Sequence, residues 1–304
     1  MNKAHKNNNK YTFIDLFAGI GGFHIALSKL GCDCVFISEF EKYARMTYEY
    51  NFKPKHPKLF KDPKRFGGDI TKITETNESI LENIPEFDIL TGGFPCQPFS
   101  QAGFKKGFLD KTRGTLFFNI VKILEVRKPK AFFIENVRGL LTHDEGRTIS
   151  LMDKVIHKLG YSFHYKLMKA SDFGIPTHRP RLYMVGFRND ADHHIPFSFP
   201  EPIPLKITMS DILGGNTDKV IGYTLRVGGV ASGIGDRRNW DTYMVDGKVR
   251  RINIKEAAKL MGFPDDFVFP VSDRQAMKQL GNSVAIPAIQ ATAAKLLEVI
   301  NQVK

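Results

Sequence analysis

The sequence contains few cysteines, a single tryptophan and no long apolar run. Its three cysteines, Cys32, Cys34 and Cys96, form no C-x-x-C pair, so the sequence predicts neither a disulfide framework nor a structural metal site. No run of about 18 apolar residues appears, and residues 1–10 are polar and rich in lysine and asparagine, unlike a signal peptide. We therefore expect a cytoplasmic protein without a metal ion or a membrane span.

Acidic residues are outnumbered by basic ones, which gives a net charge of +12. The surplus lies in residues 1–187, with 29 Lys/Arg against 19 Asp/Glu, and in residues 272–304, whereas residues 188–271 hold 11 of each. A basic balance fits a polyanionic partner, although many basic proteins bind no nucleic acid. The most basic segment, residues 51–68, is either a solvated loop or an excursion that contacts phosphates.

Short apolar runs alternate with longer amphipathic stretches over the first two thirds of the chain. Strands are predicted at Tyr11–Phe17, Cys34–Ser38, Phe87–Thr91, Ala131–Ile134 and Leu182–Phe187. Helices are predicted at Phe23–Leu30, Tyr43–Tyr50, Leu116–Val126, Ile149–Leu159, Ile254–Met261 and Ala285–Val299. This alternation predicts an α/β fold with a mostly parallel sheet covered on both faces. Residues 188–250 lack a helical period and indicate a second unit rich in loops and strands.

A glycine-rich turn follows the first predicted strand. Residues 17–22 read FAGIGG, and glycines there allow a nucleotide-like ligand to approach the backbone at the start of a helix. His24 occupies the place of the third glycine in the dinucleotide fingerprint, which disfavours a nicotinamide dehydrogenase. Glu39, at the end of the second strand, either accepts from both ribose hydroxyls or is a surface glutamate that caps the strand end. Asp69 either accepts from an adenine amino group or caps a turn. Together they predict a site for an adenosine without phosphates.

Cys96 is the candidate nucleophile. It lies in GGFPCQPFS, directly after the predicted strand Phe87–Thr91, and the flanking prolines hold the backbone extended so that the thiol projects. Cys32 and Cys34 lie in apolar surroundings and are expected to be ordinary buried thiols. Glu135 follows the strand Ala131–Ile134, so it emerges at the same edge of the sheet and is a candidate proton donor.

The order of these motifs resembles that of the DNA cytosine-5 methyltransferase family, restriction-modification type. The motifs are FAGIGG, GGFPCQPFS, ENV, HRPRLYMVG, RRINIKEAAKLMGFP and KQLGNSV. The resemblance implies a Rossmann-like catalytic domain at 1–187 and 272–304, completed by the C-terminal helix, and a target-recognition domain at 188–271. It also implies S-adenosylmethionine as cofactor with S-adenosylhomocysteine as product, double-stranded DNA as partner, a monomeric enzyme, and a restriction endonuclease acting on the same site.

The pattern and the resemblance together assign the site residues. Catalytic roles fall to Cys96, Glu135, Arg179 and Arg181. The cofactor is expected to contact Phe17, Ala18, Gly19, Gly21, Gly22, Glu39, Phe40, Asp69, Ile70, Pro95, Leu116, Asn282 and Ser283. DNA is expected to contact Gln97, Ser100, Lys105, Lys106, Arg113, Thr224, Arg226, Arg237 and Arg238. The sequence departs from the family pattern at Pro180, between the two arginines, and at Asn253 and Met261.

The chemistry explains why these groups are needed. Carbon 5 of cytosine is a poor nucleophile until a thiolate, here Cys96, adds to carbon 6, while Glu135 holds and protonates ring nitrogen N3. The cytosine must first be flipped out of the duplex, and residues 100–114, with their glycines and basic residues, form either a lid over it or a flexible surface loop.

A tRNA cytosine methyltransferase is disfavoured because its Cys-Phe-Thr signature is absent. A non-catalytic DNA-binding homologue is disfavoured because every catalytic position is occupied.

Overall fold

The computed structural model describes residues 11–94, 116–189, 196–228 and 232–302. Seven strands form one sheet in the order β3-β2-β1-β4-β5-β7-β6. Their bounds are β1 Tyr11–Leu16, β2 Cys32–Ser38, β3 Phe66–Gly67, β4 Ile89–Gly93, β5 Ala131–Val137, β6 His164–Lys169 and β7 Pro180–Phe187. The first five strands in this order run parallel, and β7 is antiparallel to both β5 and β6. The predicted α/β class with a mixed, mostly parallel sheet is confirmed.

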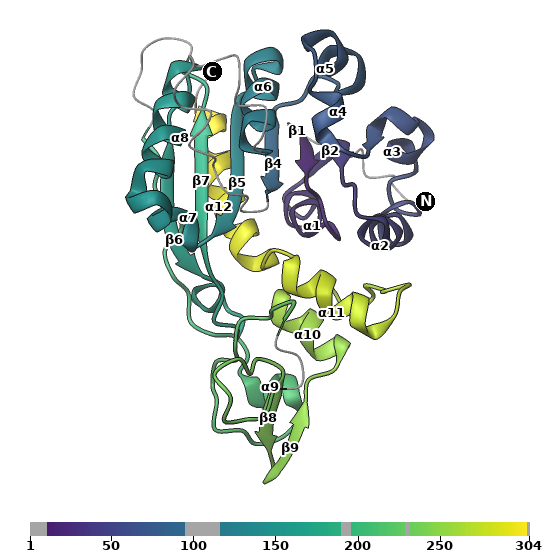
Figure 1. Cartoon of the computed structure of the whole chain (residues 1–304), viewed down its shortest axis with the longest axis vertical. Coiled ribbons are helices and arrows are strands. Elements are labelled where there is room, and N and C mark those ends of the chain that lie inside the picture. The colour runs from purple at the N-terminus through teal and green to yellow at the C-terminus, as the bar shows by residue number, and fades with distance from the viewer. Residues whose placement is uncertain (1–10, 95–115, 190–195, 229–231, 303–304) are drawn as a thin grey trace, which may run out of the picture.

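Helices cover both faces of the sheet (Figure 1). On one face lie α1 Gly22–Ser28, α2 Lys42–Phe52, α3 Pro57–Lys61 and α12 Ile286–Gln302. The other face carries α5 Asn77–Asn83, α6 Leu116–Arg127 and α8 Arg147–Lys158. Short elements complete this part: α4 Ile70–Ile73, α7 Gly139–Thr142 and the 3-10 helices Pro63–Arg65, His143–Gly146 and Ala170–Asp172. The strand pleat separates the two cores, because Phe13 of β1 packs on the α1 side whereas Ile14 and Leu16 pack on the α6 side.

The C-terminal helix α12 belongs to the core. Within the described chain one helical stretch, Asp273–Gln302, is long and apolar enough to cross a membrane, and half of its most apolar window is buried. Ile289 and Leu296 of α12 are buried where the helix packs against α1. The two ends of the described chain also meet here, since the hydroxyl of Tyr11 donates to Asn301 Oδ1 at 2.9 Å. The apolar face of α12 is therefore covered by the first helix and the sheet.

A smaller unit forms the narrow lower end of the molecule (Figure 1). It contains α9 Met209–Leu213 and a two-stranded antiparallel sheet of β8 Thr242–Val245 and β9 Lys248–Arg251. Helices α10 Ile254–Met261 and α11 Asp273–Asn282 lie between this unit and the large sheet. The side chain of Trp240 is buried in the small unit, with its indole Nε1 donating to Gly228 O at 2.8 Å.

The structure contains every predicted strand and helix and adds several that were not predicted, among them the ten-residue helix α11. Another addition is β6, whose sequence HYKLMK buries only Met168 because the strand lies at the sheet edge. The first strand ends one residue earlier than predicted, because Phe17 leaves the extended region with φ 55°. Cys32 and Cys34 are buried free thiols, as predicted.

Candidate active site

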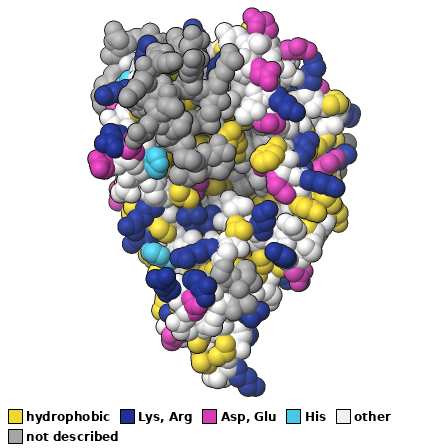
Figure 2. Space-filling view, viewed as in Figure 1, with side chains coloured by type: hydrophobic (Ala, Val, Ile, Leu, Met, Phe, Trp, Pro, Cys, Tyr) yellow, Lys and Arg dark blue, Asp and Glu magenta, His cyan; other side chains and the backbone are white. Residues whose placement is uncertain are grey.

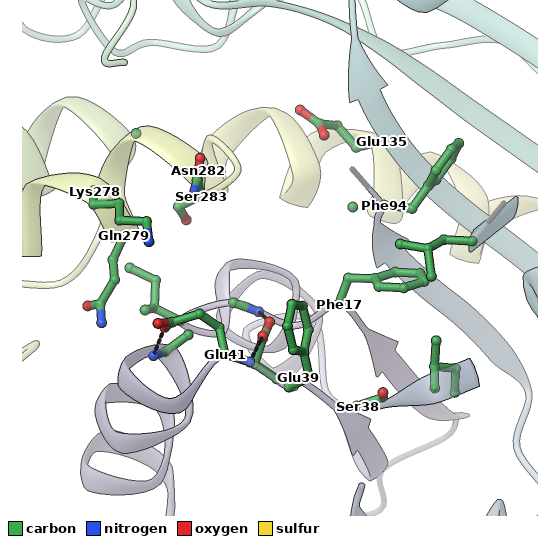
Figure 3. Close-up of a pocket in the computed structure, with 18 of the residues that line it drawn as sticks. Phe17, Ser38, Glu39, Glu41, Phe94, Glu135, Lys278, Gln279, Asn282 and Ser283 are labelled. Atoms are coloured by element: carbon green, nitrogen blue, oxygen red, sulfur yellow. Dashed lines mark hydrogen bonds between the residues drawn. The ribbon is translucent and has the colours of Figure 1, made fainter. Parts of the chain in front are cut away.

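A cavity of about 820 Å³ opens where β1, β2, β4 and β5 end. Ligands of open α/β sheets bind at this carboxyl edge, and the volume lies in the range of small-molecule and cofactor sites. Figure 3 shows Phe17 and Phe94 on the sheet side, Glu39 and Glu41 on the α2 side, and Asn282 and Ser283 opposite them.

The glycine turn forms the floor between β1 and α1. The backbone turns sharply because Phe17, Gly19 and Gly21 all have positive φ, and Gly21 N donates to Ala18 O at 2.8 Å. Close packing requires the last two glycines. A Cβ at Gly21 would lie 2.4 Å from the Phe52 ring, and one at Gly22 would lie 2.5 Å from Val284 Cγ2. The motif therefore brings the start of α1 against α2 and the residues that precede α12.

Glu39 is held rigidly by backbone amides. One carboxylate oxygen accepts from Gly19 N at 2.8 Å and the other accepts from Glu41 N at 2.7 Å. Burial raises the pKa of Glu39, and these backbone hydrogen bonds pull it partly back. An ionised carboxylate has about four lone-pair sites, so each oxygen can still accept from a ligand hydroxyl.

Asp69 lines the same cavity and also caps α4. Its Oδ1 accepts from Thr71 N at 3.0 Å and from Thr71 Oγ1 at 2.8 Å. The predicted turn cap thus exists, and it leaves Oδ2 as the carboxylate oxygen without a role in that cap. Nearby, Ile70 is buried, Leu116 begins α6, and Phe40 lines the cavity with 75% of its surface exposed. An exposed aromatic ring beside a cavity offers a stacking surface for a planar group.

The opposite wall comes from α11 and the residues after it. Asn282 and Ser283 line the cavity as predicted, together with Gln275, Lys278 and Gln279, which were not predicted. The Gln279 amide joins α11 to α2, because its Nε2 donates to Tyr43 O at 2.9 Å and its Oε1 accepts from Thr47 Oγ1 at 3.0 Å. The motif KQLGNSV contains Lys278 and Gln279, so extending the prediction to the whole motif would have found them.

Glu135 and Arg181 form a buried ion pair at the end of β5. Arg181 Nε lies 3.0 Å from Glu135 Oε1. Burial raises the pKa of Glu135, while Arg181 and then Arg179 lower it. Gly93 of β4 pairs with Glu135 in the parallel register, and a Cβ at Gly93 would lie 3.6 Å from Glu135 Oε2. The carboxyl therefore stands beside the strand that leads towards Cys96 in sequence.

Phe94 is the last described residue before the candidate nucleophile in sequence. Phe94 is buried, and its carbonyl accepts from Asn136 Nδ2 at 2.9 Å, which fixes the backbone directly before residue 95. Seven predicted residues lie outside the described part of the chain: Pro95, Cys96, Gln97, Ser100, Lys105, Lys106 and Arg113.

Arg179 is buried, with 2% of its surface exposed. Its guanidinium donates to Leu225 O at 3.3 Å, to Gly281 O at 3.1 Å and to Ser283 O. Burial and then the neighbouring Arg181 lower the pKa of Arg179, whereas Glu135 raises it, and together they bring it to about 9. This side chain lines the cavity but directs its donors to backbone carbonyls.

The predicted DNA contacts in the smaller unit differ in their surroundings. The Thr224 hydroxyl donates to His178 O, and Arg226 and Arg237 are exposed. Arg238 is paired with Asp236, through Nε to Oδ1 at 3.1 Å and Nη2 to Oδ2 at 2.7 Å. Figure 2 shows Lys and Arg side chains gathered across the middle of the viewed face, between the large sheet and the narrow end.

The basic segment 51–68 contains β3, the strand at one edge of the sheet. Four of its basic residues form exposed ion pairs: Lys53 with Glu49 at 2.6 Å, Lys55 with Asp266 at 2.9 Å, Lys64 with Glu82 at 2.6 Å, and Arg65 with Asp62 at 3.4 Å. Such exposed pairs fit the solvated-loop interpretation as well as the phosphate-contact interpretation.

Comparison with known proteins identifies the family. The family model described as C-5 cytosine-specific DNA methylase matches residues 11–230 and 214–298. The chain is 40% identical to type II methyltransferase M.NlaX of Neisseria lactamica, over 96% of this chain and 98% of that protein. It is 38% identical to type II methyltransferase M.HhaI of Haemophilus parahaemolyticus, over 92% of each.

Solved structures show the same fold at lower identity. The S. pombe Dnmt2 methyltransferase superimposes with a TM-score of 0.69 at 20% identity, covering 96% of this chain and 99% of that chain. A mutant of Spodoptera frugiperda DNMT2 gives a TM-score of 0.68 at 19% identity, covering 96% and 100%. The chain belongs to the C-5 cytosine-specific DNA methylase family and is a DNA (cytosine-5-)-methyltransferase.

Proposed function

We propose that this enzyme methylates a cytosine flipped out of a specific short duplex sequence, with Cys96 as nucleophile, and protects DNA in a type II restriction-modification system. The observation that carries the mechanism is the buried Glu135–Arg181 pair, which stands in register with Gly93, three residues before Cys96. The biological role is supported by the close relatives, which are named type II methyltransferases.

The enzymes of this family use S-adenosylmethionine, which supplies an electrophilic methyl group when bound. The cavity fits an adenosine with a short zwitterionic chain. Its volume of about 820 Å³ can hold a ligand of this size, and Phe17 contributes an aromatic ring. The carboxylates of Glu39 and Asp69 can accept hydrogen bonds from hydroxyl and amino groups. We propose that Phe17 packs on the adenine, that Glu39 holds the ribose, and that Asn282 and Ser283 close the opposite side.

In the proposed reaction the Cys96 thiolate adds to carbon 6 of cytosine, and the electron pair of the carbon 5–carbon 6 bond becomes available at carbon 5. Glu135 holds N3 and the exocyclic amine and gives N3 a proton as charge develops. Its burial supports this role, because the raised pKa of Glu135 favours the protonated acid. The positive charge of Arg181 favours the thiolate form of Cys96. After carbon 5 has been methylated, a base removes its proton and the thiolate departs, which restores the carbon 5–carbon 6 double bond, and N3 returns its proton to Glu135.

We propose that residues 188–271 form the target-recognition domain and that Thr224, Arg226, Arg237 and Arg238 contact DNA within it. Exposed arginines suit guanine edges because they form bidentate hydrogen bonds. Arg238 must exchange or share its pairing with Asp236 to do so. Gln97, Ser100, Lys105, Lys106 and Arg113 complete the proposed DNA contacts near the flipped base. The enzyme is proposed to act as a cytoplasmic monomer, alongside an endonuclease that cuts the same site.

Methylation of random-sequence duplex DNA, followed by cytosine-conversion sequencing, tests activity and target site together. We expect conversion-resistant cytosines in one short sequence, none with Cys96→Ser, and a stable covalent adduct when the target cytosine carries fluorine at carbon 5. Methylation of tRNA in place of duplex DNA would favour a tRNA methyltransferase. DNA binding by the folded wild-type protein without methyl transfer would favour a non-catalytic homologue.

A further inference from the structure

Arg179 connects two parts of the molecule that the proposed function assigns to different ligands. Its guanidinium donates to Leu225 O in the smaller unit, and to Gly281 O and Ser283 O at the end of α11. These acceptors lie 46, 102 and 104 residues away in sequence. Gly281 and Ser283 line the cofactor cavity, whereas Leu225 lies between two predicted DNA contacts, Thr224 and Arg226.

The segment that carries Arg179 is also fastened to residues 222–225. His178 N donates to Gly222 O at 2.9 Å, and Gly222 N donates to Pro176 O at 2.8 Å. Thr177 Oγ1 donates to Tyr223 O at 3.1 Å, and the Thr224 hydroxyl donates to His178 O. Residues 222–224 are thus hydrogen-bonded along residues 176–178, which lead into β7.

A direct backbone contact completes the connection. A Cβ at Gly281 would lie 2.8 Å from the carbonyl carbon of Arg226 and 2.9 Å from its oxygen, so the backbone of Arg226 rests on α11 with no side chain between them. The same helix reaches the cofactor side through Gln279, which hydrogen-bonds α2. Because Gly281 has an ordinary helical position without positive φ, this contact, and not backbone conformation, requires glycine there.

We propose that Arg179 is a positioning residue that couples the cofactor pocket to the recognition segment 222–226. The inference rests on the proposed function. Occupation of the cavity fixes residues 281–283, which through Arg179 fix the backbone on either side of Leu225, so cofactor binding tightens DNA binding. Thermodynamic linkage requires the reverse effect to have the same size.

Lysine cannot replace arginine in this role. A lysine keeps the positive charge, but its single ammonium group is a compact donor and cannot span three carbonyls on two segments as a planar guanidinium does. Arg179→Lys should therefore leave the two binding sites present and weaken the link between them.

The test measures the affinity for a duplex carrying the methylated sequence, with and without saturating S-adenosylhomocysteine. For the wild type we expect the cofactor product to tighten DNA binding about tenfold, within the usual range of coupling between sites. For Arg179→Lys we expect this ratio to fall to about twofold or less, with the affinity of the variant for S-adenosylhomocysteine without DNA measured first so that the cofactor product is saturating. A lost pocket would instead abolish that affinity.

A second variant keeps the test valid if Arg179→Lys fails to fold. Gly281→Ala leaves Arg179 in place and displaces the Arg226 backbone, so it should reduce the ratio in the same way. Gly139→Ala is the matched control, since nothing lies within 4 Å of a Cβ there, and it should keep the wild-type ratio. A wild-type ratio near one, or an unchanged ratio in both variants, would overturn the coupling. Methyl transfer, measured separately, would decide the proposed function.

Discussion

At the residue scale, Asp15 is wholly buried near the end of β1. Burial raises the pKa of its carboxyl well above the ordinary value, the backbone amide of His24 lowers it, and the charge of Glu39 raises it. The folded chain therefore holds this proton to higher pH than the unfolded chain does. The stability linked to Asp15 is fully present below the ordinary carboxyl pKa and is lost as the pH rises through the raised pKa.

Replacing Asp15 with asparagine removes this titration while keeping the shape of the side chain. We expect Asp15→Asn to have a melting temperature that declines less than that of the wild type as the pH rises from about 4 towards 8. Asp33→Asn is the control, because Asp33 is exposed on the neighbouring strand β2. Parallel melting-temperature profiles for wild type and Asp15→Asn would contradict this account.

Glu39 gives a second prediction at this scale. A glutamine has one acceptor oxygen, so Glu39→Gln cannot accept from both Gly19 N and Glu41 N as the carboxylate does. The amide also loses a charged acceptor for the ribose hydroxyls that Glu39 is proposed to hold. A hydrogen bond to a charged group is worth about 1.5–3 kcal/mol, so the dissociation constant for S-adenosylhomocysteine should rise at least about tenfold. Isothermal titration calorimetry measures this, and the exposed Glu78→Gln should match the wild type.

The sequence was sufficient to place Glu39 and Glu135 at one edge of the sheet, because parallel strands present their carboxyl ends there; their roles stay predictions. It was not sufficient to predict how Arg179 is used. The motif suggested a group at the reaction centre, but the carbonyls that Arg179 binds come from segments that only the tertiary fold brings together. The pairing of Arg238 with Asp236 is local and could have been anticipated from their spacing.

At the scale of elements, the predicted closing helix is confirmed as α12, whose buried face packs on α1. Leu296 is 1% exposed. Leu296→Ala should lower the free energy of unfolding by about 2–5 kcal/mol, because it leaves a cavity in this layer. Leu297→Ala, on the half-buried side of the same helix, should cost clearly less. Urea unfolding of both variants measures the difference, and equal losses would argue against this packing.

Strands β3 and β6, helix α11 and the short helices escaped prediction for physical reasons. The sequence of α11, DRQAMKQLGN, is mostly polar, and its buried side chains include only two apolar ones, Ala276 and Leu280. β6 lies at the sheet edge and exposes Tyr165 and Leu167, so its apolar pattern is diluted. β3 is two residues long and is defined by its pairing with Ile37 and Ser38, not by its own composition. Neither hydrophobic periodicity nor strand propensity predicts such elements, because their structure depends on tertiary contacts.

At the scale of the whole molecule, the net charge of +12 should govern binding to DNA. If several lysines and arginines contact phosphates, affinity for duplex DNA should fall by about 10³–10⁵ between roughly 50 and 200 mM salt. Lys106→Ala or Arg113→Ala should make that dependence shallower. Fluorescence anisotropy at several salt concentrations measures the slopes. The affinity for S-adenosylhomocysteine serves as the control and should change little.

The meeting of the two chain ends has a consequence for synthesis. Tyr11 and Asn301 are 290 residues apart in sequence and yet hydrogen-bonded, and Gly22 packs on Val284. Until the ribosome has synthesised α12, the apolar face of α1 therefore remains uncovered. The glycine turn also lacks Val284, against which Gly22 packs in the complete chain. We expect an interrupted translation product that lacks α12 to be unable to form the cofactor pocket. Methylation would then begin only with nearly complete molecules, and prematurely terminated copies would leave the host genome unmarked.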